Sequence, residues 1–250
     1  MNPTKVILAL VGAMALVAAN QAAAADAHTE KLKALFDVRQ PAGSGPFPAV
    51  VLVSGCSGFD AKLAKGAYDR VNAKLIERGF VTIRVDYVGA RGATNCQSPT
   101  PIAKDLVAVD IMVGVRHLHT LPFVDTKKIN LLGWSYGGGS IMAALAGTSS
   151  AAAAIVYYPH CPGVAPWNEK TPMLILAGAK DNVAPSRQCE GIVQRAPEPA
   201  VVKVISYEGA HHAFDVEELP AETQYQWGTL GYHPEAAAKS WEEVERFLRR

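Results

Sequence analysis

The stretch that most constrains the fold is Lys128–Gly138, in which a short apolar run leads into a Gly-x-Ser-x-Gly turn. Ser135 stands between Gly133 and Gly137, and an alanine-rich segment of helical character, Ser140–Gly147, follows directly. In a strand–turn–helix of this kind the turn is so tight that a side chain at either glycine would collide with the backbone. We therefore expect a nucleophile elbow, which raises the Ser135 hydroxyl above the edge of a sheet.

Apolar runs and helical segments alternate along the rest of the chain. The runs expected as strands are Ala49–Val53, Phe80–Val85, Ile129–Leu132, Ala153–Tyr157, Met173–Leu176 and Val201–Ile205. The segments expected as helices are Ala61–Arg78, Ile102–Leu118, Ser186–Arg195 and Pro234–Leu248. Strands that are apolar throughout are typical of a parallel sheet covered on both faces. We predict an α/β fold, a mostly parallel central sheet with helices on both faces, in one domain over residues 26–250.

Residues 1–25 predict a secretory signal peptide. Lys5 precedes the apolar stretch Val6–Ala19, and the small residues Ala22–Ala25 follow it, as in a signal with a cleavage site after Ala25 or Ala27. The apolar stretch is short for a membrane span, so an N-terminal anchor is the less favoured alternative. We expect an exported protein, periplasmic or secreted, without stable membrane association after cleavage.

Charge and cysteine spacing limit the partners. The formal net charge is +1, with acids and bases scattered along the chain, so nothing indicates a nucleic-acid-binding surface. The four cysteines match no zinc template, and we expect no metal and no cofactor. A small, neutral or modestly charged molecule is the expected partner, and the pattern does not indicate an oligomeric state.

A serine nucleophile at neutral pH needs a base, and the base needs a carboxylate that fixes its tautomer. On a nucleophile-elbow fold these partners follow the serine in the order acid, then histidine, at the carboxyl ends of later strands. Asp181 lies just past the run Met173–Leu176, and His211 and His212 follow the last strand. The sequence therefore predicts a catalytic triad of Ser135, Asp181 and a histidine of this pair.

Several of these segments together resemble the dienelactone hydrolase family of α/β-hydrolases. They are Gly133–Gly138, Gly178–Asp181, His212–Phe214 and the ending Tyr232–Ala237 with its final helix. The resemblance implies an α/β-hydrolase fold and hydrolysis of a small carboxylic ester or lactone without a cofactor. It also implies that His212 is the base, and His211 beside it is either a substrate contact or an exposed neighbour. The best-known members use cysteine as nucleophile, so Ser135 indicates a serine-using branch.

The developing oxyanion needs two N–H donors. One is the backbone N–H of Tyr136, directly after the nucleophile. The second is expected from the small-residue loop Ser54–Gly58, with Cys56 preferred and Ser57 as the alternative. Arg91 and Trp134 are further candidates for the substrate pocket, against the alternatives of a solvated arginine and a packed tryptophan.

Four cysteines in an exported protein suggest two disulfides, although they allow three connectivities. In the fold that the resemblance implies, the strand before Cys56 neighbours the strand before Cys96. The strand before Cys161 likewise neighbours the one leading to Cys189. We predict the bonds Cys56–Cys96 and Cys161–Cys189.

Taken together, these features predict a serine hydrolase that forms an acyl-enzyme. Two alternatives remain. A peptidase would share the triad but usually adds a specificity domain, for which this chain has no room. An idle binding protein would be expected to have lost a member of the triad.

Overall fold

The computed structural model describes residues 20–146, 151–161, 171–190 and 202–249. Most of the predicted signal peptide, residues 1–19, lies outside these residues, and residues 20–33 form a helix. No helix in the described part of the chain has the length and apolarity needed to span a bilayer.

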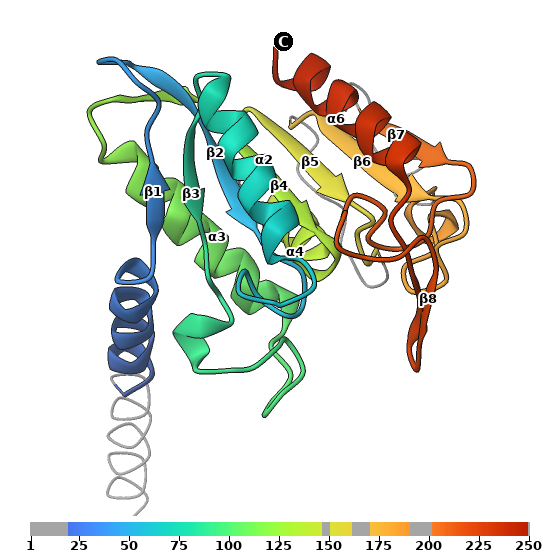
Figure 1. The fold of residues 1–250 in the computed structure, drawn as a ribbon. Coiled ribbons are helices and arrows are strands. Elements are labelled where there is room, and N and C mark those ends of the chain that lie inside the picture. The colour runs from blue at the N-terminus through green and yellow to red at the C-terminus, as the bar shows by residue number, and fades with distance from the viewer. Residues whose placement is uncertain (1–19, 147–150, 162–170, 191–201, 250) are drawn as a thin grey trace, which may run out of the picture.

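The described residues contain a seven-stranded sheet in the order β1-β3-β2-β4-β5-β6-β7 (Figure 1). The strands are β1 (Asp37–Arg39), β2 (Phe47–Val53), β3 (Val81–Arg84), β4 (Val124–Trp134), β5 (Ala153–Tyr157), β6 (Met173–Gly178) and β7 (Val202–Tyr207). Only β1 pairs antiparallel with its neighbour, and the other pairs are parallel. The predicted mostly parallel sheet is therefore confirmed. All the parallel strands consequently end at the same edge.

Helices cover both faces of this sheet. They are α2 (Lys65–Glu77), α3 (Lys104–His119), α4 (Ser135–Leu145) and α6 (Pro234–Leu248), with a short 3-10 helix η1 (Gly89–Arg91). α2 and α6 pack on one face, and α3 and α4 pack on the other. Of the predicted helix Ser186–Arg195, residues 187–190 are helical and 191–195 lie outside the described residues.

The two faces bury separate hydrophobic layers, because successive residues of a strand point to opposite sides of the sheet. On β4, Leu131 joins the layer under α3 and α4, whereas Leu132 joins the layer under α2 and α6. Both side chains are fully buried. Because helices cover both faces of the strands, neither side of a strand needs to be polar, and the sequence therefore shows continuous apolar runs.

Two regions add elements beyond those expected from the sequence. Leu32–Val38 contains the end of the helix over residues 20–33 and the start of β1. After β7 the chain adds a small hairpin, β8 (Thr223–Tyr225) and β9 (Gly228–Leu230), which sequence analysis did not predict.

Candidate active site

Ser135 lies at the junction of β4 and α4, as the elbow motif predicts. Its φ of 49° is in the left-handed region, which is strained for a residue with a side chain. Gly137 allows the tight turn, because a Cβ there would lie 2.2 Å from the Ser54 carbonyl oxygen. Helix α4 therefore starts against the end of β2, and the Ser135 side chain is left partly exposed at the edge of the sheet.

Asp181 and His212 are carried by loops that follow β6 and β7. These loops are joined by hydrogen bonds, from Ala179 N–H to the Tyr207 carbonyl at 2.9 Å and from Lys180 N–H to the Ala210 carbonyl at 2.9 Å. They can approach so closely because Gly178 has no side chain, and a Cβ there would lie 2.4 Å from the Ala210 carbonyl oxygen.

The three predicted side chains meet in one hydrogen-bonded chain. His212 Nε2 lies 3.0 Å from Ser135 Oγ, and His212 Nδ1 lies 2.8 Å from Asp181 Oδ2. The second oxygen of Asp181 accepts the N–H groups of Val183 and Ala184, both at 2.8 Å. The Asp181 carboxylate is fully buried and its acceptor atoms are satisfied, so it can hold an imidazole in one orientation.

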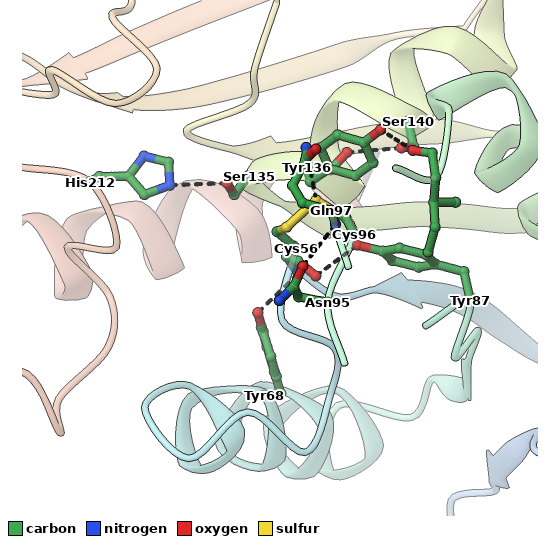
Figure 2. The surroundings of a disulfide bond; sticks show 12 residues. Cys56, Tyr68, Tyr87, Asn95, Cys96, Gln97, Ser135, Tyr136, Ser140 and His212 are labelled. Atoms are coloured by element: carbon green, nitrogen blue, oxygen red, sulfur yellow. Dashed lines mark hydrogen bonds between the residues drawn. A yellow bond between two sulfur atoms is a disulfide. The ribbon is translucent and has the colours of Figure 1, made fainter. Parts of the chain in front are cut away.

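The loop after β2 lies beside Ser135, and four contacts hold it in place (Figure 2). The Gly55 N–H donates to the Tyr68 hydroxyl at 3.0 Å, and the Tyr87 hydroxyl donates to the Gly55 carbonyl at 2.8 Å. Cys96 N–H donates to the Cys56 carbonyl at 2.7 Å, and a disulfide joins the same two residues. Because N–H and C=O of a trans peptide point in opposite directions, the Tyr87 contact also sets the direction of the Cys56 N–H.

The second disulfide joins Cys161 and Cys189, at Cα–Cα 5.3 Å. Both bonds are the pairs expected from the sequence, and the chain has no free cysteine. Among the described residues no group of His, Cys, Asp or Glu side chains is arranged to hold a metal ion.

Two of the candidate pocket residues, Arg91 and Trp134, make contacts with other buried groups. The Arg91 guanidinium donates to the Tyr87 carbonyl and forms an ion pair with Asp110, a buried carboxylate of α3, so it is neither solvated nor directed at Ser135. Trp134 is 1% exposed and packs between Tyr68 and Tyr157, so the packing alternative describes it correctly. In both cases a buried partner that the sequence pattern does not reveal determines the side chain's direction.

The His211 side chain is largely buried, with 13% of it exposed, and its Nε2 lies 3.9 Å from Glu222 Oε2. Its neighbour His212, rather than His211, is the histidine that meets Ser135 and Asp181. The choice between the two residues of the pair therefore agrees with the resemblance.

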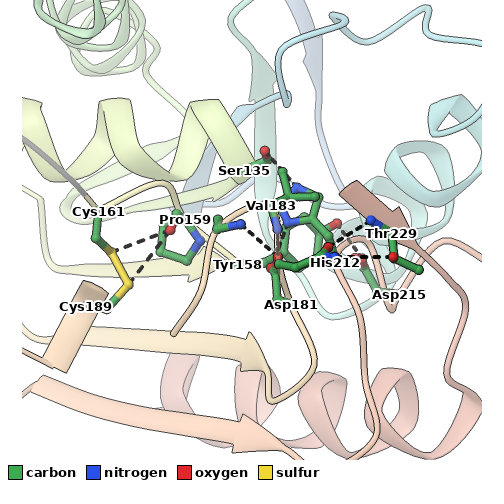
Figure 3. A network of polar contacts seen from close by, with 12 residues as sticks. Ser135, Tyr158, Pro159, Cys161, Asp181, Val183, Cys189, His212, Asp215 and Thr229 are labelled. Atoms are coloured by element: carbon green, nitrogen blue, oxygen red, sulfur yellow. Dashed lines mark hydrogen bonds and ion pairs between the residues drawn. A yellow bond between two sulfur atoms is a disulfide. The ribbon is translucent and has the colours of Figure 1, made fainter. Parts of the chain in front are cut away.

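A second carboxylate, which sequence analysis missed, lies close to the histidine (Figure 3). Asp215 Oδ1 accepts the Tyr158 hydroxyl at 2.6 Å, and its Oδ2 accepts the Trp134 indole N–H at 2.9 Å. Burial raises the pKa of Asp215, while these two hydrogen bonds and the nearby His212 oppose that rise. Its place three residues after His212 was the only sequence signal.

On the other side of the site, Lys104 Nζ lies 2.8 Å from His160 Nδ1. Burial lowers the pKa of both groups, and the Lys104 charge lowers the pKa of His160 further. The His160 backbone N–H also points to the Ser135 carbonyl, at 3.4 Å. Two nitrogen-bearing side chains therefore flank the elbow.

Comparison with known proteins places the chain in a family. A model of the dienelactone hydrolase family matches residues 37–250. A relative from Synechocystis, named "Putative carboxymethylenebutenolidase", is 21% identical over 229 residues, covering 84% of this chain and 88% of its own. A Yersinia pestis protein of the same name is 25% identical over 227 residues, covering 80% of this chain and 77% of its own.

Solved structures share the fold. A Klebsiella pneumoniae protein named "Putative Dienelactone Hydrolase" has a TM-score of 0.69 at 17% identity, covering 86% of this chain and 99% of its own. Esterase 2 of Thermogutta terrifontis, with propionate bound, has a TM-score of 0.61 at 19% identity, covering 85% and 88%. At such low identity these likenesses establish the architecture alone.

Proposed function

Because this chain belongs to the dienelactone hydrolase family and is a carboxylic ester or lactone hydrolase, we propose that it cleaves its substrate with a Ser135–His212–Asp181 triad. The observation that carries the proposal is the continuous chain from Ser135 Oγ through the imidazole to Asp181, with separations of 3.0 and 2.8 Å. The first separation lies in the range that proton transfer from a hydroxyl to a base requires, and the second is a hydrogen bond that orients the ring.

In the proposed mechanism, His212 Nε2 takes the proton of Ser135 as the hydroxyl oxygen attacks the substrate carbonyl. Asp181 accepts the Nδ1–H of the ring, so the lone pair stays on Nε2, and the carboxylate stabilises the imidazolium that forms. The imidazolium then gives its proton to the departing alcohol oxygen, leaving an acyl group on Ser135. Water hydrolyses this acyl-enzyme by the same route, with His212 again as base.

The oxyanion is proposed to be held by the backbone N–H groups of Tyr136 and Cys56. Tyr136 is in the first turn of α4, where N–H groups have no acceptor within the helix. The Cys56 N–H belongs to the peptide whose carbonyl the Tyr87 hydroxyl holds. Loss of one such donor typically costs about 3–4 kcal/mol of transition-state stabilisation.

We propose a small ester or lactone as substrate, and residues 1–25 as a signal that exports the protein to the periplasm or the medium. Two disulfides and the lack of free cysteine support an oxidising compartment. Names of the relatives support the substrate class: the carboxymethylenebutenolidases suggest lactones, and the Thermogutta protein suggests simple esters.

The first experiment compares p-nitrophenyl acetate turnover by the wild-type protein and Ser135→Ala. We expect the variant to lose at least about 10⁴-fold in kcat, because the nucleophile is gone. Equal rates for the two proteins would end the proposal.

A fluorophosphonate probe separates the enzyme from the idle binding protein, since only an activated serine is labelled. We expect labelling of wild type at Ser135 and none of Ser135→Ala. A panel of short-chain esters, aryl esters, unsaturated lactones and peptides would then identify the preferred substrate and test the peptidase alternative.

A further inference from the structure

Asp215 joins the segments that carry the nucleophile and the base. It lies on the loop of His212 and beside Tyr158 (Figure 3). In the sequence, Trp134 directly precedes Ser135, and Tyr158 follows the end of β5. Each carboxylate oxygen accepts one hydrogen bond, at 2.9 Å from Trp134 and at 2.6 Å from Tyr158. An ionised carboxylate, which only accepts, satisfies both donors at once.

Tyr158 also contacts His212, the proposed base, through its ring. Its ring centroid lies 4.5 Å from that of His212, at an angle of 59° between the ring planes. Its φ of 34° is unusual for a residue with a side chain, and its N–H is held by the Leu176 carbonyl at 2.6 Å. Strained backbone of this kind persists only where the surroundings hold it, and it is frequent at active sites.

We propose that Asp215 is a positioning residue, which holds the Tyr158 ring against His212 and ties the histidine loop to Trp134. The inference rests on the proposed triad, because it concerns the alignment of His212 with Ser135. Asp181 sets which nitrogen carries the proton, but one hydrogen bond at Nδ1 leaves the ring able to tilt about that contact. The Tyr158 ring packed against the imidazole limits this motion, and a tilt of His212 would lengthen its contact with Ser135.

Three variants test whether Asp215 positions His212, with p-nitrophenyl acetate as substrate. Tyr158→Phe removes one tether and should lower kcat about tenfold with KM within about twofold. Asp215→Leu removes both acceptors and should lower kcat at least about 100-fold. Asp215→Asn keeps a partner for both Trp134 and Tyr158, so kcat should stay within about threefold.

The matched control is Tyr207→Phe. Tyr207 packs on Phe214 in the same aromatic layer, and its hydroxyl has no hydrogen-bond partner among the described residues. This variant should leave kcat and KM unchanged. Thermal unfolding of each variant identifies any that fails to fold. If Asp215→Leu fails to fold, Tyr158→Phe and Asp215→Asn still test the positioning role of Asp215.

The inference is overturned if Tyr158→Phe matches Tyr207→Phe in kcat, or if Asp215→Asn, which keeps a partner for both Trp134 and Tyr158, lowers kcat as much as Tyr158→Phe does. A wild-type rate no higher than that of Ser135→Ala would instead refute the proposed function, so the two failures are distinguishable.

Discussion

The two faces of the sheet bury layers of different chemistry. The layer under α3 and α4 is mainly aliphatic, built from valine, isoleucine, leucine and alanine. The layer under α2 and α6 is rich in aromatic side chains: Phe59, Tyr68, Trp134, Tyr157, Tyr158, Tyr207, Phe214 and Phe247. Both layers exclude water, but only the second is crowded with rings that also carry polar groups.

This difference has a consequence at the edge of the sheet. An aromatic residue such as Tyr or Trp buries a large apolar surface and still offers a hydrogen bond at its far end. Tyr68 thus reaches the Gly55 N–H, while Trp134 and Tyr158 reach Asp215. The aromatic layer therefore connects the core to the loops of the active site at several points, whereas the aliphatic layer does so through Tyr87 and the Cys56–Cys96 disulfide.

The largest expected effect comes from a pair of neighbouring substitutions, Leu131→Ala and Leu132→Ala. Both residues are fully buried on β4, so each change should cost about 3–5 kcal/mol of unfolding free energy. Only Leu132→Ala, in the layer of Trp134, should also lower kcat per folded molecule. Urea unfolding with fluorophosphonate titration of active sites measures both quantities, and equal kcat values would remove the distinction between the layers.

The disulfides sharpen the comparison, because both pack in the aliphatic layer. The bonds close loops with sequence separations of 40 and 28 residues, so replacing either cysteine pair by alanine should cost about 3–4 kcal/mol. Removing Cys56–Cys96 should lower kcat as well, since that bond braces the loop beside Ser135. A kcat loss of the same size after removing Cys161–Cys189 would contradict this role.

A smaller effect is expected for Tyr68→Phe, which keeps the ring and removes the acceptor of the Gly55 N–H. The lost hydrogen bond should cost about 1 kcal/mol of stability. We expect a decrease in kcat with little change in KM, because the loop that is proposed to hold the oxyanion is loosened. Steady-state kinetics beside Tyr207→Phe tests this, and indistinguishable kcat values would contradict it.

The smallest effect concerns His160, on the side of α3 and α4. Its pKa is lowered by burial and by Lys104, so below its ordinary value of 6.5 the unfolded chain binds a proton more readily than the folded one. Stability should therefore fall as pH drops from 6.5, by less than about 1 kcal/mol for this partly exposed group. His160→Gln, which cannot titrate, should flatten that decline, and parallel curves for the two proteins would refute it.

The sequence predicted those parts of the molecule that depend on local pattern. The central strands and the Ser135 elbow follow from apolar runs and tight-turn glycines, and the segments ending in Asp181 and His212 from strand order. Asp215 and Tyr158 were missed, because their partners are far away in the chain and their residue types are ordinary in a loop and at a strand end. Arg91 was misjudged for the same reason, since its partner Asp110 belongs to a separate helix.

The loop after His212 has a closed base. Gly231 N–H donates to the His212 carbonyl at 3.1 Å, and His233 N–H donates to the Phe214 carbonyl at 2.9 Å, so the chain leaves and returns at one place. The β8–β9 hairpin lies between these two hydrogen-bonded ends of the loop, and Trp227 is exposed at its tip. The exposed residues around Trp227 can therefore change without breaking these two hydrogen bonds, whereas Thr229 is tied to the loop of Asp181 by its N–H, which donates to Asn182 Oδ1 at 2.8 Å.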